Sequence, residues 1–295
     1  MIFIYNFMNK KYANLLIIII ALFLSYSTLI HARDGTLYER GLQSLNEVIE
    51  DNESTSITSE KTINEDLEIK ENDKSTSNLI KAVVYIERGG CPGDGLGEWY
   101  ATGSGSMIDR RGLILTNYHV VDECKGQILI GISESADRDP IIRFIAEVVA
   151  YDKDLDIAVL NITKFYKDKS VFKNDNLSYL TIGDSDTANL GDDINVWGYP
   201  GSRAENTGQS RLNLSKGTVS GIDSYKGYKR GWIISDVNIT WGNSGGAAVN
   251  NDNELIAIPS EGRGVGSGGG ILGALRPVNI ALDTIESARR ITGKK

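Results

Sequence analysis

The stretch Trp241-Gly-Asn-Ser-Gly-Gly-Ala247 places one serine among small residues in a chain of 295 residues. The flanking glycines let the backbone bend tightly and let a carbonyl carbon come close to Ser244. A serine hydroxyl is a weak nucleophile, so it needs a base and donors for an oxyanion. The chain has only two histidines, and one of them, His119, lies in Thr116-Asn-Tyr-His-Val-Val121. His119 is therefore the candidate base, and the backbone N–H groups of Gly242 and Ser244 are the candidate oxyanion donors.

Three alternating aspartates supply a candidate partner for the histidine. Asp152, Asp154 and Asp156 come just before the apolar run Ile157–Leu160. Asp156 abuts this run directly, so its carboxylate is the one most easily buried beside an imidazole, whereas the other two are expected to face solvent. A buried carboxylate needs a partner, and His119 can supply one. In a Ser-His-Asp arrangement the serine attacks a carbonyl, the histidine transfers the proton, and the aspartate holds the imidazole tautomer.

From Leu79 onward the chain consists of short β-type runs separated by turn residues. Many short strands without alternating long helices favour barrels or a sandwich over βαβ units. Two groups of about six strands predict an all-β fold of two antiparallel six-stranded barrels, about 79–163 and about 177–280, with a cleft between them. A run with helical spacing, Val278–Ile291, closes the chain. The predicted strands are Lys81–Ile86, Gly103–Ile108, Leu113–Thr116, Gln127–Gly131, Ile141–Tyr151, Ile157–Ile162, Asp193–Gly198, Leu212–Ile222, Gly231–Val237, Ala247–Asn250, Glu254–Pro259 and Ile271–Leu275.

The N-terminus has the features of an export signal. Two lysines, Lys10 and Lys11, precede the unbroken apolar run Leu15–Leu24, and small residues follow it. Such a run is shorter than the roughly 20 residues that a spanning helix needs. Counting on to Ile30 lengthens the run to sixteen residues. Residues 1–32 are therefore predicted to be either a cleaved signal peptide or an N-terminal membrane anchor.

Residues 33–78 form an acidic, polar segment that we expect to be a disordered linker. Residues 34–80 include twelve acidic and four basic residues, which account for the whole net charge of −8. The remaining 27 acids and 27 bases cancel, but three of these bases, Lys10, Lys11 and Arg33, precede the acidic segment, so the globular domain that we place at 79–295 carries a small net charge of −3. Because no basic stripe is present, binding to nucleic acid is not expected.

The chain has two cysteines, Cys91 in a Gly-rich loop and Cys124 five residues after His119. An even number of cysteines in an exported protein favours a disulfide, with two free thiols as the alternative. The bridge would join the loop before one strand to the loop after the histidine. No cluster of Cys and His has the spacing of metal ligands, so neither a metal site nor a cofactor is predicted.

Several ordered motifs resemble those of the HtrA/Deg branch of the chymotrypsin-like serine proteases over roughly residues 79–290. The order His119, Asp156, Ser244 separates this family from other serine-hydrolase folds. The resemblance implies a double β-barrel that hydrolyses peptide bonds in protein or peptide substrates without a cofactor. It also implies that His119 is the base, Asp156 its orienting partner and Ser244 the nucleophile. The motifs are Thr116-Asn-Tyr-His-Val-Val121, Asp156-Ile-Ala-Val-Leu160, Ile182-Gly-Asp-Ser185 with Gly191-Asp192, Lys216-Gly-Thr-Val-Ser-Gly221 and Gly242-Asn-Ser-Gly-Gly-Ala247.

The chain departs from the pattern of this class at three points. Asn243 stands where digestive proteases carry an aspartate that pairs with a freed N-terminus, so activation by cleavage of a pro-segment is not expected. Trp241 is bulkier than the residue that this turn usually carries. Family members often continue into PDZ domains, whereas this chain ends about fifty residues after Ser244, so we expect no PDZ domain.

By the same resemblance, Asn238, Ile239, Ile258 and Ser260 line the primary substrate pocket. Asn238 brings no negative charge, so a preference for Lys or Arg is not supported, and a small or medium apolar residue before the scissile bond is expected. The Gly-rich run Glu261–Gly270 has neither the strand-to-helix context nor the lysine of a phosphate-binding loop. This composition favours a flexible loop at the pocket rim.

These observations favour an exported serine endopeptidase that acts on unfolded or exposed protein segments. It would be periplasmic or secreted, or held at the membrane by its N-terminal segment. Two other functions remain open on sequence alone. One is a binding or chaperone-like module that keeps the fold without efficient turnover, and the other is an esterase that uses the same triad. The sequence carries no signal of the oligomeric state.

Overall fold

The computed structural model of the chain describes residues 76–91, 99–122, 125–173, 176–201, 210–264 and 271–293. All of the described residues belong to one compact unit, Asn72–Lys295. The predicted signal or anchor at 1–32 lies outside the described residues, as does the expected linker up to residue 75. Residues 76–82 are helical and lead into the first strand. Within the described residues, no helix is long and apolar enough to cross a membrane.

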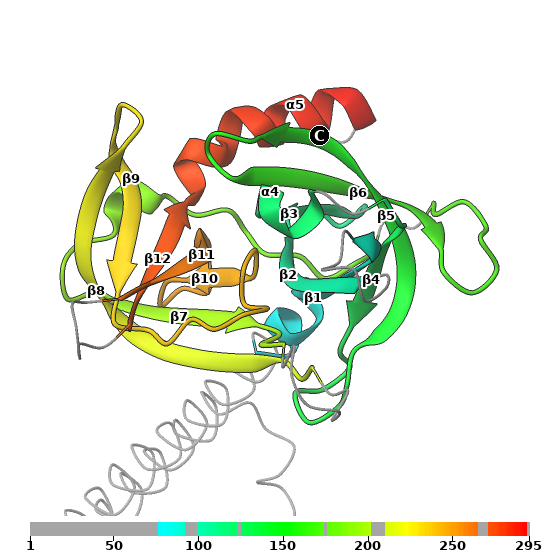
Figure 1. Ribbon diagram of the computed structural model, residues 1–295, viewed down its shortest axis with the longest axis horizontal. Coiled ribbons are helices and arrows are strands. Elements are labelled where there is room, and N and C mark those ends of the chain that lie inside the picture. Colours follow the sequence, from blue (N-terminus) through cyan, green and yellow to red (C-terminus); the bar gives the residue numbers. More distant parts are fainter. Residues whose placement is uncertain are drawn as a thin grey trace, which may run out of the picture. The chain divides into compact units, whose positions relative to one another are not determined.

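The first barrel is closed by six antiparallel strands in the order β1-β2-β3-β6-β5-β4 (Figure 1). Closure satisfies the strand edges that an open sheet would leave exposed. The short strand β3 belongs wholly to the core, because all four of its residues are buried. The strands are β1 (Val83–Cys91), β2 (Trp99–Met107), β3 (Leu113–Thr116), β4 (Ile128–Ile132), β5 (Ile141–Asp152) and β6 (Ile157–Phe165).

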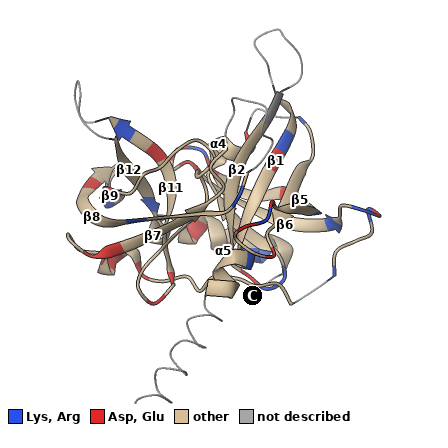
Figure 2. Ribbon diagram, turned by 90° about the horizontal axis from the view of Figure 1, so that it is seen from below, with Lys and Arg blue, Asp and Glu red and all other residues tan. Residues whose placement is uncertain are grey.

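The second barrel is also closed by six antiparallel strands, in the order β10-β11-β12-β9-β8-β7. Counted from β7, this order is the same as that of the first barrel, and the predicted double barrel is confirmed. In the view of Figure 2, acidic and basic residues are interspersed over both barrels. The strands are β7 (Asp193–Gly198), β8 (Asn213–Tyr225), β9 (Tyr228–Ser235), β10 (Ala247–Val249), β11 (Leu255–Gly264) and β12 (Ile271–Pro277), with a 3₁₀ turn η1 (Ser185–Thr187) before them.

The turn between β2 and β3 is stabilised by hydrogen bonds among its own residues. The Asp109 carboxylate accepts a hydrogen bond from the Arg111 backbone N–H at 2.6 Å. The Gly112 N–H donates to the Asp109 carbonyl at 3.0 Å. Gly112 has a φ of +95°, in the left-handed region that glycine adopts without strain. These residues therefore form the turn of a hairpin, in which β2 and β3 pair antiparallel.

Strand β11 is longer than predicted. It runs to Gly264, whereas the apolar pattern ends at Pro259. The segment Glu261–Gly264, expected in a flexible rim loop, instead pairs in register with β12. Within it, the Arg263 guanidinium lies 4.4 Å from the centroid of the Trp232 ring on β9. Cross-strand pairing and stacking thus override the loop-like composition of this segment.

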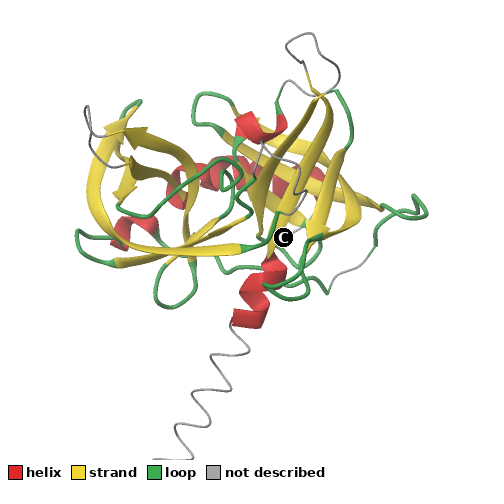
Figure 3. Ribbon diagram, turned by 60° about the horizontal axis from the view of Figure 1, so that its bottom comes forward, coloured by secondary structure: helices red, strands yellow, loops and turns green. Residues whose placement is uncertain are grey.

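The two barrels lie side by side (Figures 1 and 3) and are joined through Tyr199, which follows β7 and is fully buried. Its hydroxyl is hydrogen-bonded to the Ser133 hydroxyl of the first barrel at 3.0 Å. Its ring meets that of Tyr85 edge to face, with 5.7 Å between centroids. Burial raises the pKa of Tyr199, so the phenol that joins the barrels stays neutral.

The chain returns from the second barrel to the first through η2 (Val278–Ala281) and α5 (Leu282–Thr292). Helix α5 packs against β5 and β6 (Figure 1). Ile285 is fully buried on the packed face, whereas Ile291 is 66% exposed. Gly293 has a φ of +65° and ends the helix with the left-handed cap that glycine favours. The predicted C-terminal helix is present, with a 3₁₀ first turn.

We expect Ile285→Ala to lower the free energy of unfolding by about 2–5 kcal/mol, because it removes buried methylene groups and leaves a cavity. The matched control is Ile291→Ala on the same helix, which should change stability by no more than about 0.5 kcal/mol. Denaturant unfolding of both variants and of the wild type provides the measurement. Equal stability of Ile285→Ala and the wild type would contradict a stabilising role of α5 on the first barrel.

Candidate active site

His119 lies in α4 (Tyr118–Val121), a single helical turn that follows β3. Its ring Nδ1 lies 2.8 Å from Oδ2 of Asp156, and its backbone N–H donates to Oδ1 of the same carboxylate at 2.9 Å. Both oxygens of the aspartate therefore hold one histidine. The ring contact fixes the tautomer that leaves Nε2 free to accept a proton. The two side chains are 50% and 26% exposed, so the pair is accessible to a substrate.

Asp156 has an uncommon backbone conformation. Its φ is +56°, in the left-handed region that is strained for a residue with a side chain. The turn before it is built by Asp152, whose carboxylate accepts a hydrogen bond from the Leu155 N–H at 2.9 Å. The Asp156 carbonyl is held in turn by the Asn117 side-chain amide at 2.9 Å. Two sets of hydrogen bonds thus maintain the strained residue that faces His119.

Asn117 is a buried link that sequence reasoning missed. Besides the Asp156 carbonyl, its Nδ2 group donates to the Ser260 hydroxyl at 2.7 Å. The Ser260 carbonyl accepts a hydrogen bond from the Ser244 hydroxyl at 3.3 Å. One buried amide, two residues before His119, therefore connects the segments that carry all three predicted catalytic residues. The available signal was a polar residue directly after the short strand Leu113–Thr116, which is apolar except for Thr116.

Ser244 lies on the turn that precedes β10 in the second barrel. Gly245 in this turn has a φ of +81°, and a Cβ on it would lie 2.1 Å from Oγ1 of Thr116 in the first barrel. Gly242 has a φ of +92°, and a Cβ there would lie 2.3 Å from the backbone nitrogen of Gly201. Only glycine permits approaches this close. The approach at Gly245 brings the serine turn against β3, which leads to His119, and the approach at Gly242 brings it against the chain that follows β7.

The Ser244 hydroxyl is hydrogen-bonded within the protein, whereas the candidate oxyanion donors are not hydrogen-bonded to any described residue. The hydroxyl donates to the Ser260 carbonyl, and no hydrogen bond joins it to His119 within the described part of the chain. Hydrogen bonds in unliganded sites are often long and tighten only when substrate binds. The N–H groups of Gly242 and Ser244 donate to no residue that the structure describes. Neither N–H group is therefore committed to an acceptor within that part of the chain.

The residues assigned to the primary pocket lie in different environments. Ile239 and Ile258 are buried in the barrels, at 6% and 1% exposure, whereas Asn238 is exposed. Ser260 is buried between the Asn117 amide and the Ser244 hydroxyl. Of these four residues, Ser260 is thus the one seen in contact with the candidate nucleophile.

The predicted disulfide falls largely outside the described residues. Cys124 is not among them, and Cys91 is described only through its backbone in β1. The residues next to the two cysteines are hydrogen-bonded, because the Lys125 N–H donates to the Gly90 carbonyl at 3.1 Å. The Cys91–Cys124 bridge stays a prediction.

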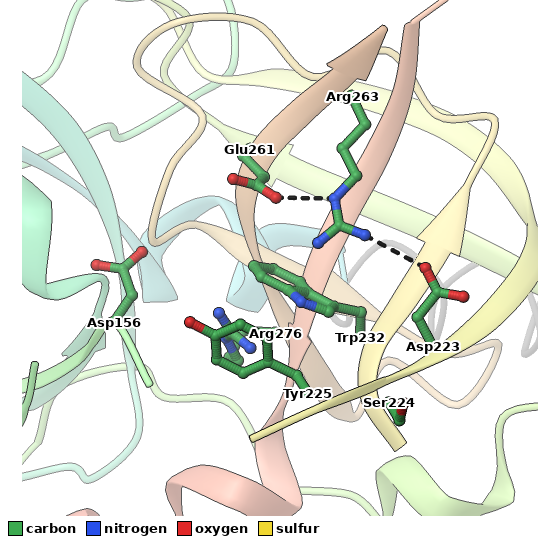
Figure 4. Close-up of a pocket in the computed structure, with 8 residues that line it drawn as sticks. All are labelled: Asp156, Asp223, Ser224, Tyr225, Trp232, Glu261, Arg263 and Arg276. Atoms are coloured by element: carbon green, nitrogen blue, oxygen red, sulfur yellow. Dashed lines mark hydrogen bonds and ion pairs between the residues drawn. The ribbon is translucent and has the colours of Figure 1, made fainter. Parts of the chain in front are cut away.

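A cavity of about 500 Å³ opens beside Asp156 (Figure 4). Two ion pairs cross its rim, because Arg263 binds Glu261 at 2.8 Å and Asp223 at 3.3 Å. The lining side chains come mainly from β8, β9, β11 and β12, so the cavity belongs mostly to the second barrel, and Ser244 is not one of its lining residues. The lining residues are Asp156, Asp223, Ser224, Tyr225, Trp232, Glu261, Arg263 and Arg276.

Arg276 forms the inner wall of this cavity and is only 2% exposed. Its guanidinium lies 3.4 Å from the centroid of the Trp232 ring and 4.5 Å from that of Tyr225. It also donates to the Gly231 carbonyl at 3.0 Å. Burial lowers the pKa of Arg276, while the two aromatic faces offset part of the loss of hydration. The guanidinium and the two rings thus pack together in the lining that they share with Asp156.

The model of the trypsin-like peptidase domain matches residues 103–258, just over half of the chain. This range runs from β2 into β11 and includes His119, Asp156 and Ser244. The chain belongs to the trypsin-like peptidase family. Within this family it is similar to DegP-like and HtrA-type proteases, which are among its relatives and structural neighbours.

The probable periplasmic serine endoprotease DegP-like of Halomonas elongata is 32% identical over 200 residues, 65% of this chain and 36% of the relative. The periplasmic pH-dependent serine endoprotease DegQ of Escherichia coli is 31% identical over 183 residues, 61% of this chain and 35% of the relative. The chain thus spans about a third of the length of these curated relatives. A solved structure of the HtrA-type protease AlgW with a tripeptide has a TM-score of 0.54 and 26% identity, covering 72% of this chain and 62% of that chain.

We expect Asp156→Asn to lower kcat for peptide hydrolysis by about 10⁴-fold, because an amide favours the wrong imidazole tautomer. Asp154→Asn is the matched control, since the Asp154 side chain is 81% exposed and pairs with Lys226 rather than with the histidine. Its kcat should stay within about twofold of the wild-type value. Steady-state kinetics on one peptide substrate compares the two. A larger loss from Asp154→Asn would move the orienting role to Asp154.

Proposed function

We propose that this protein is an exported serine endopeptidase that cleaves unfolded or exposed protein segments through an acyl-enzyme intermediate. The observation that carries the proposal is the His119–Asp156 contact of 2.8 Å beside a glycine turn that presents Ser244 with two N–H donors that bind no described residue. Membership of the trypsin-like peptidase family supports the reaction class. The relatives named periplasmic serine endoproteases support both the substrate class and a periplasmic location.

In the proposed first half-reaction, the Ser244 hydroxyl leaves the Ser260 carbonyl and binds Nε2 of His119. The Ser244 oxygen attacks the scissile carbonyl carbon while its proton passes to the imidazole. The Asp156 carboxylate stabilises the imidazolium that forms. The N–H groups of Gly242 and Ser244 bind the oxyanion, and such a donor is worth about 2.7–4 kcal/mol in the transition state. The C–N bond then breaks, the imidazolium gives its proton to the leaving amine, and an ester to Ser244 remains.

In the second half-reaction, water replaces the departed amine. His119 takes a proton from the water, and the resulting hydroxide attacks the ester carbonyl at the same oxyanion donors. The bond to the Ser244 oxygen breaks, and the imidazolium returns the proton to that oxygen. The carboxylic acid product leaves, and the enzyme is restored without any cofactor.

We assign the substrate backbone to the edge of β11 beyond Ser260. The segment Glu261–Gly264 pairs with β12 on one side, whereas β10 pairs with β11 only as far as Ala257. An extended peptide can add a strand to such an edge through main-chain hydrogen bonds, which suits binding of varied unfolded sequences. Because side chains alternate along a strand, every second one would face the cavity beside Asp156.

The remaining assignments belong to the same proposal. Asn238, Ile239, Ile258 and Ser260 are assigned to the primary pocket for a small or medium apolar side chain. A bridge between Cys91 and Cys124 would tie β1 to the chain that follows α4, in keeping with an oxidising compartment. The segment 1–32 would direct export or hold the domain at the outer side of the membrane.

We expect Ser244→Ala and His119→Ala each to lower kcat by about 10⁴–10⁶-fold, because each removes one member of a unit that acts together. Neither side chain belongs to a barrel core, so both variants should unfold at the same denaturant concentration as the wild type. The measurements are casein hydrolysis and covalent labelling by a fluorophosphonate probe. Only the wild type should both cleave casein and take up the label on Ser244.

Other outcomes distinguish the alternatives. Casein cleavage by Ser244→Ala at nearly the wild-type rate would refute the proposed nucleophile. A wild-type protein that takes up no label and cleaves nothing would favour a binding or chaperone-like module. A wild-type protein that hydrolyses a simple ester but not casein would favour an esterase.

A further inference from the structure

The carbonyl groups of the oxyanion turn, residues 241–244, are each held by a separate donor group. The carbonyl of Trp241 accepts a hydrogen bond from the Gly201 N–H at 2.8 Å, and that of Asn243 accepts one from the Gly246 N–H at 3.0 Å. In a planar trans peptide the N–H points away from the C=O. The N–H groups of these two peptides are the proposed oxyanion donors. Because the carbonyls of Trp241 and Asn243 are held, the N–H groups of Gly242 and Ser244 each point away from the group that holds the carbonyl of the same peptide.

The other two carbonyls of the turn, those of Gly242 and Ser244, are held by a single residue of the other barrel, Ser104 on β2. The Ser104 hydroxyl donates to the Gly242 carbonyl at 2.7 Å. The Ser104 backbone N–H donates to the Ser244 carbonyl at 2.9 Å. Ser104 is fully buried, so neither bond is exposed to competition from solvent. One first-barrel residue thus contacts the turn on both sides of Asn243.

The orientation of Ser104 is itself determined by its neighbours. Its hydroxyl oxygen accepts a hydrogen bond from the Tyr199 N–H at 2.8 Å, so the hydroxyl proton is left to the Gly242 carbonyl. Its own carbonyl accepts one from the Thr116 hydroxyl at 2.7 Å. The other three donors to the turn are backbone N–H groups, which a side-chain substitution leaves in place. The Ser104 hydroxyl is the one that a substitution removes.

We propose that Ser104 is a positioning residue for the oxyanion site, an inference that rests on the proposed function. Gly242 has a φ of +92°, and glycine populates other backbone conformations at little cost. A rotation of the peptides around Gly242 would turn its N–H away from the substrate. The hydroxyl of Ser104 holds the Gly242 carbonyl and opposes this rotation before substrate arrives. Donors that are already oriented need no rearrangement during the reaction.

The test compares Ser104→Ala with Ser106→Ala in the full-length protein. Ser106 lies two residues along the same strand, is also fully buried, and its hydroxyl has no hydrogen-bond partner among the described residues. Both variants remove one buried hydroxyl from β2, but only Ser104→Ala removes a bond to the turn. We expect kcat to fall at least tenfold in Ser104→Ala with KM within about threefold of the wild type. Ser106→Ala should keep both constants.

A second readout separates positioning from folding. A peptidyl trifluoromethyl ketone forms a tetrahedral adduct with a serine and places an oxyanion at the donors, whereas a product peptide binds without one. Ser104→Ala should weaken binding of the ketone at least tenfold and leave the affinity for the product peptide unchanged. Ser104→Cys, which keeps a weak donor in a somewhat larger side chain of the same shape, should give intermediate values. This variant serves as the test if Ser104→Ala does not fold.

The possible outcomes test the role of Ser104 and the proposed function separately. Wild-type kcat and ketone affinity in a folded Ser104→Ala or Ser104→Cys variant would overturn the role of Ser104. So would equal losses in Ser104→Ala and Ser106→Ala, or a loss confined to thermal stability and KM. A wild-type protein that neither cleaves casein nor takes up the fluorophosphonate would instead overturn the proposed function. A selective loss of kcat and ketone affinity supports the positioning role.

Discussion

The structure depends on the close approach of the serine turn to the first barrel. His119 and Asp156 belong to that barrel, whereas Ser244 belongs to the second, so the site exists only if the two barrels dock in one register. Gly245 makes this docking possible, because any side chain there would overlap the Thr116 hydroxyl, 2.1 Å from the position of a Cβ. Misplacement of reacting groups by about 1 Å costs about 10²-fold in rate. The glycine turn is therefore a geometric requirement of the site as well as a flexible segment.

Much of the fold and of the candidate triad could be predicted from local sequence. The strands follow from short apolar runs between turn residues, and the hairpin at Asp109–Gly112 follows from its turn chemistry. His119, Asp156 and Ser244 could be named because each lies at the end or start of an apolar run, where strands deliver side chains to a cleft. The choice of Asp156 over Asp154 rested on burial beside β6. In the structure, Asp154 forms an ion pair with Lys226, and Asp156 is hydrogen-bonded to His119.

What local sequence did not reveal are the contacts between distant segments. The Ser104 hydroxyl reaches a carbonyl 138 positions away, and the Asn117 amide reaches Ser260 across 143 positions. In the sequence, Ser104 is one serine in a Gly-Ser run and looks no different from Ser106, whose hydroxyl has no partner among the described residues. The extension of β11 through Arg263 likewise depends on an aromatic ring of another strand. Such residues gain their roles only when the barrel closes.

The hydrogen bonds of Asn243 bear on how the oxyanion site forms. In digestive proteases a carboxylate at this place pairs with a freed N-terminus, and an amide has no charge with which to make that pair. Here Asn243 is 5% exposed, its N–H donates to the Thr240 carbonyl at 3.1 Å, and its carbonyl accepts from Gly246. Neutral hydrogen bonds thus hold the segment that an ion pair would otherwise hold. On the proposed function, the oxyanion site then forms as the barrels dock, so the same contacts that stabilise the fold also make the site competent.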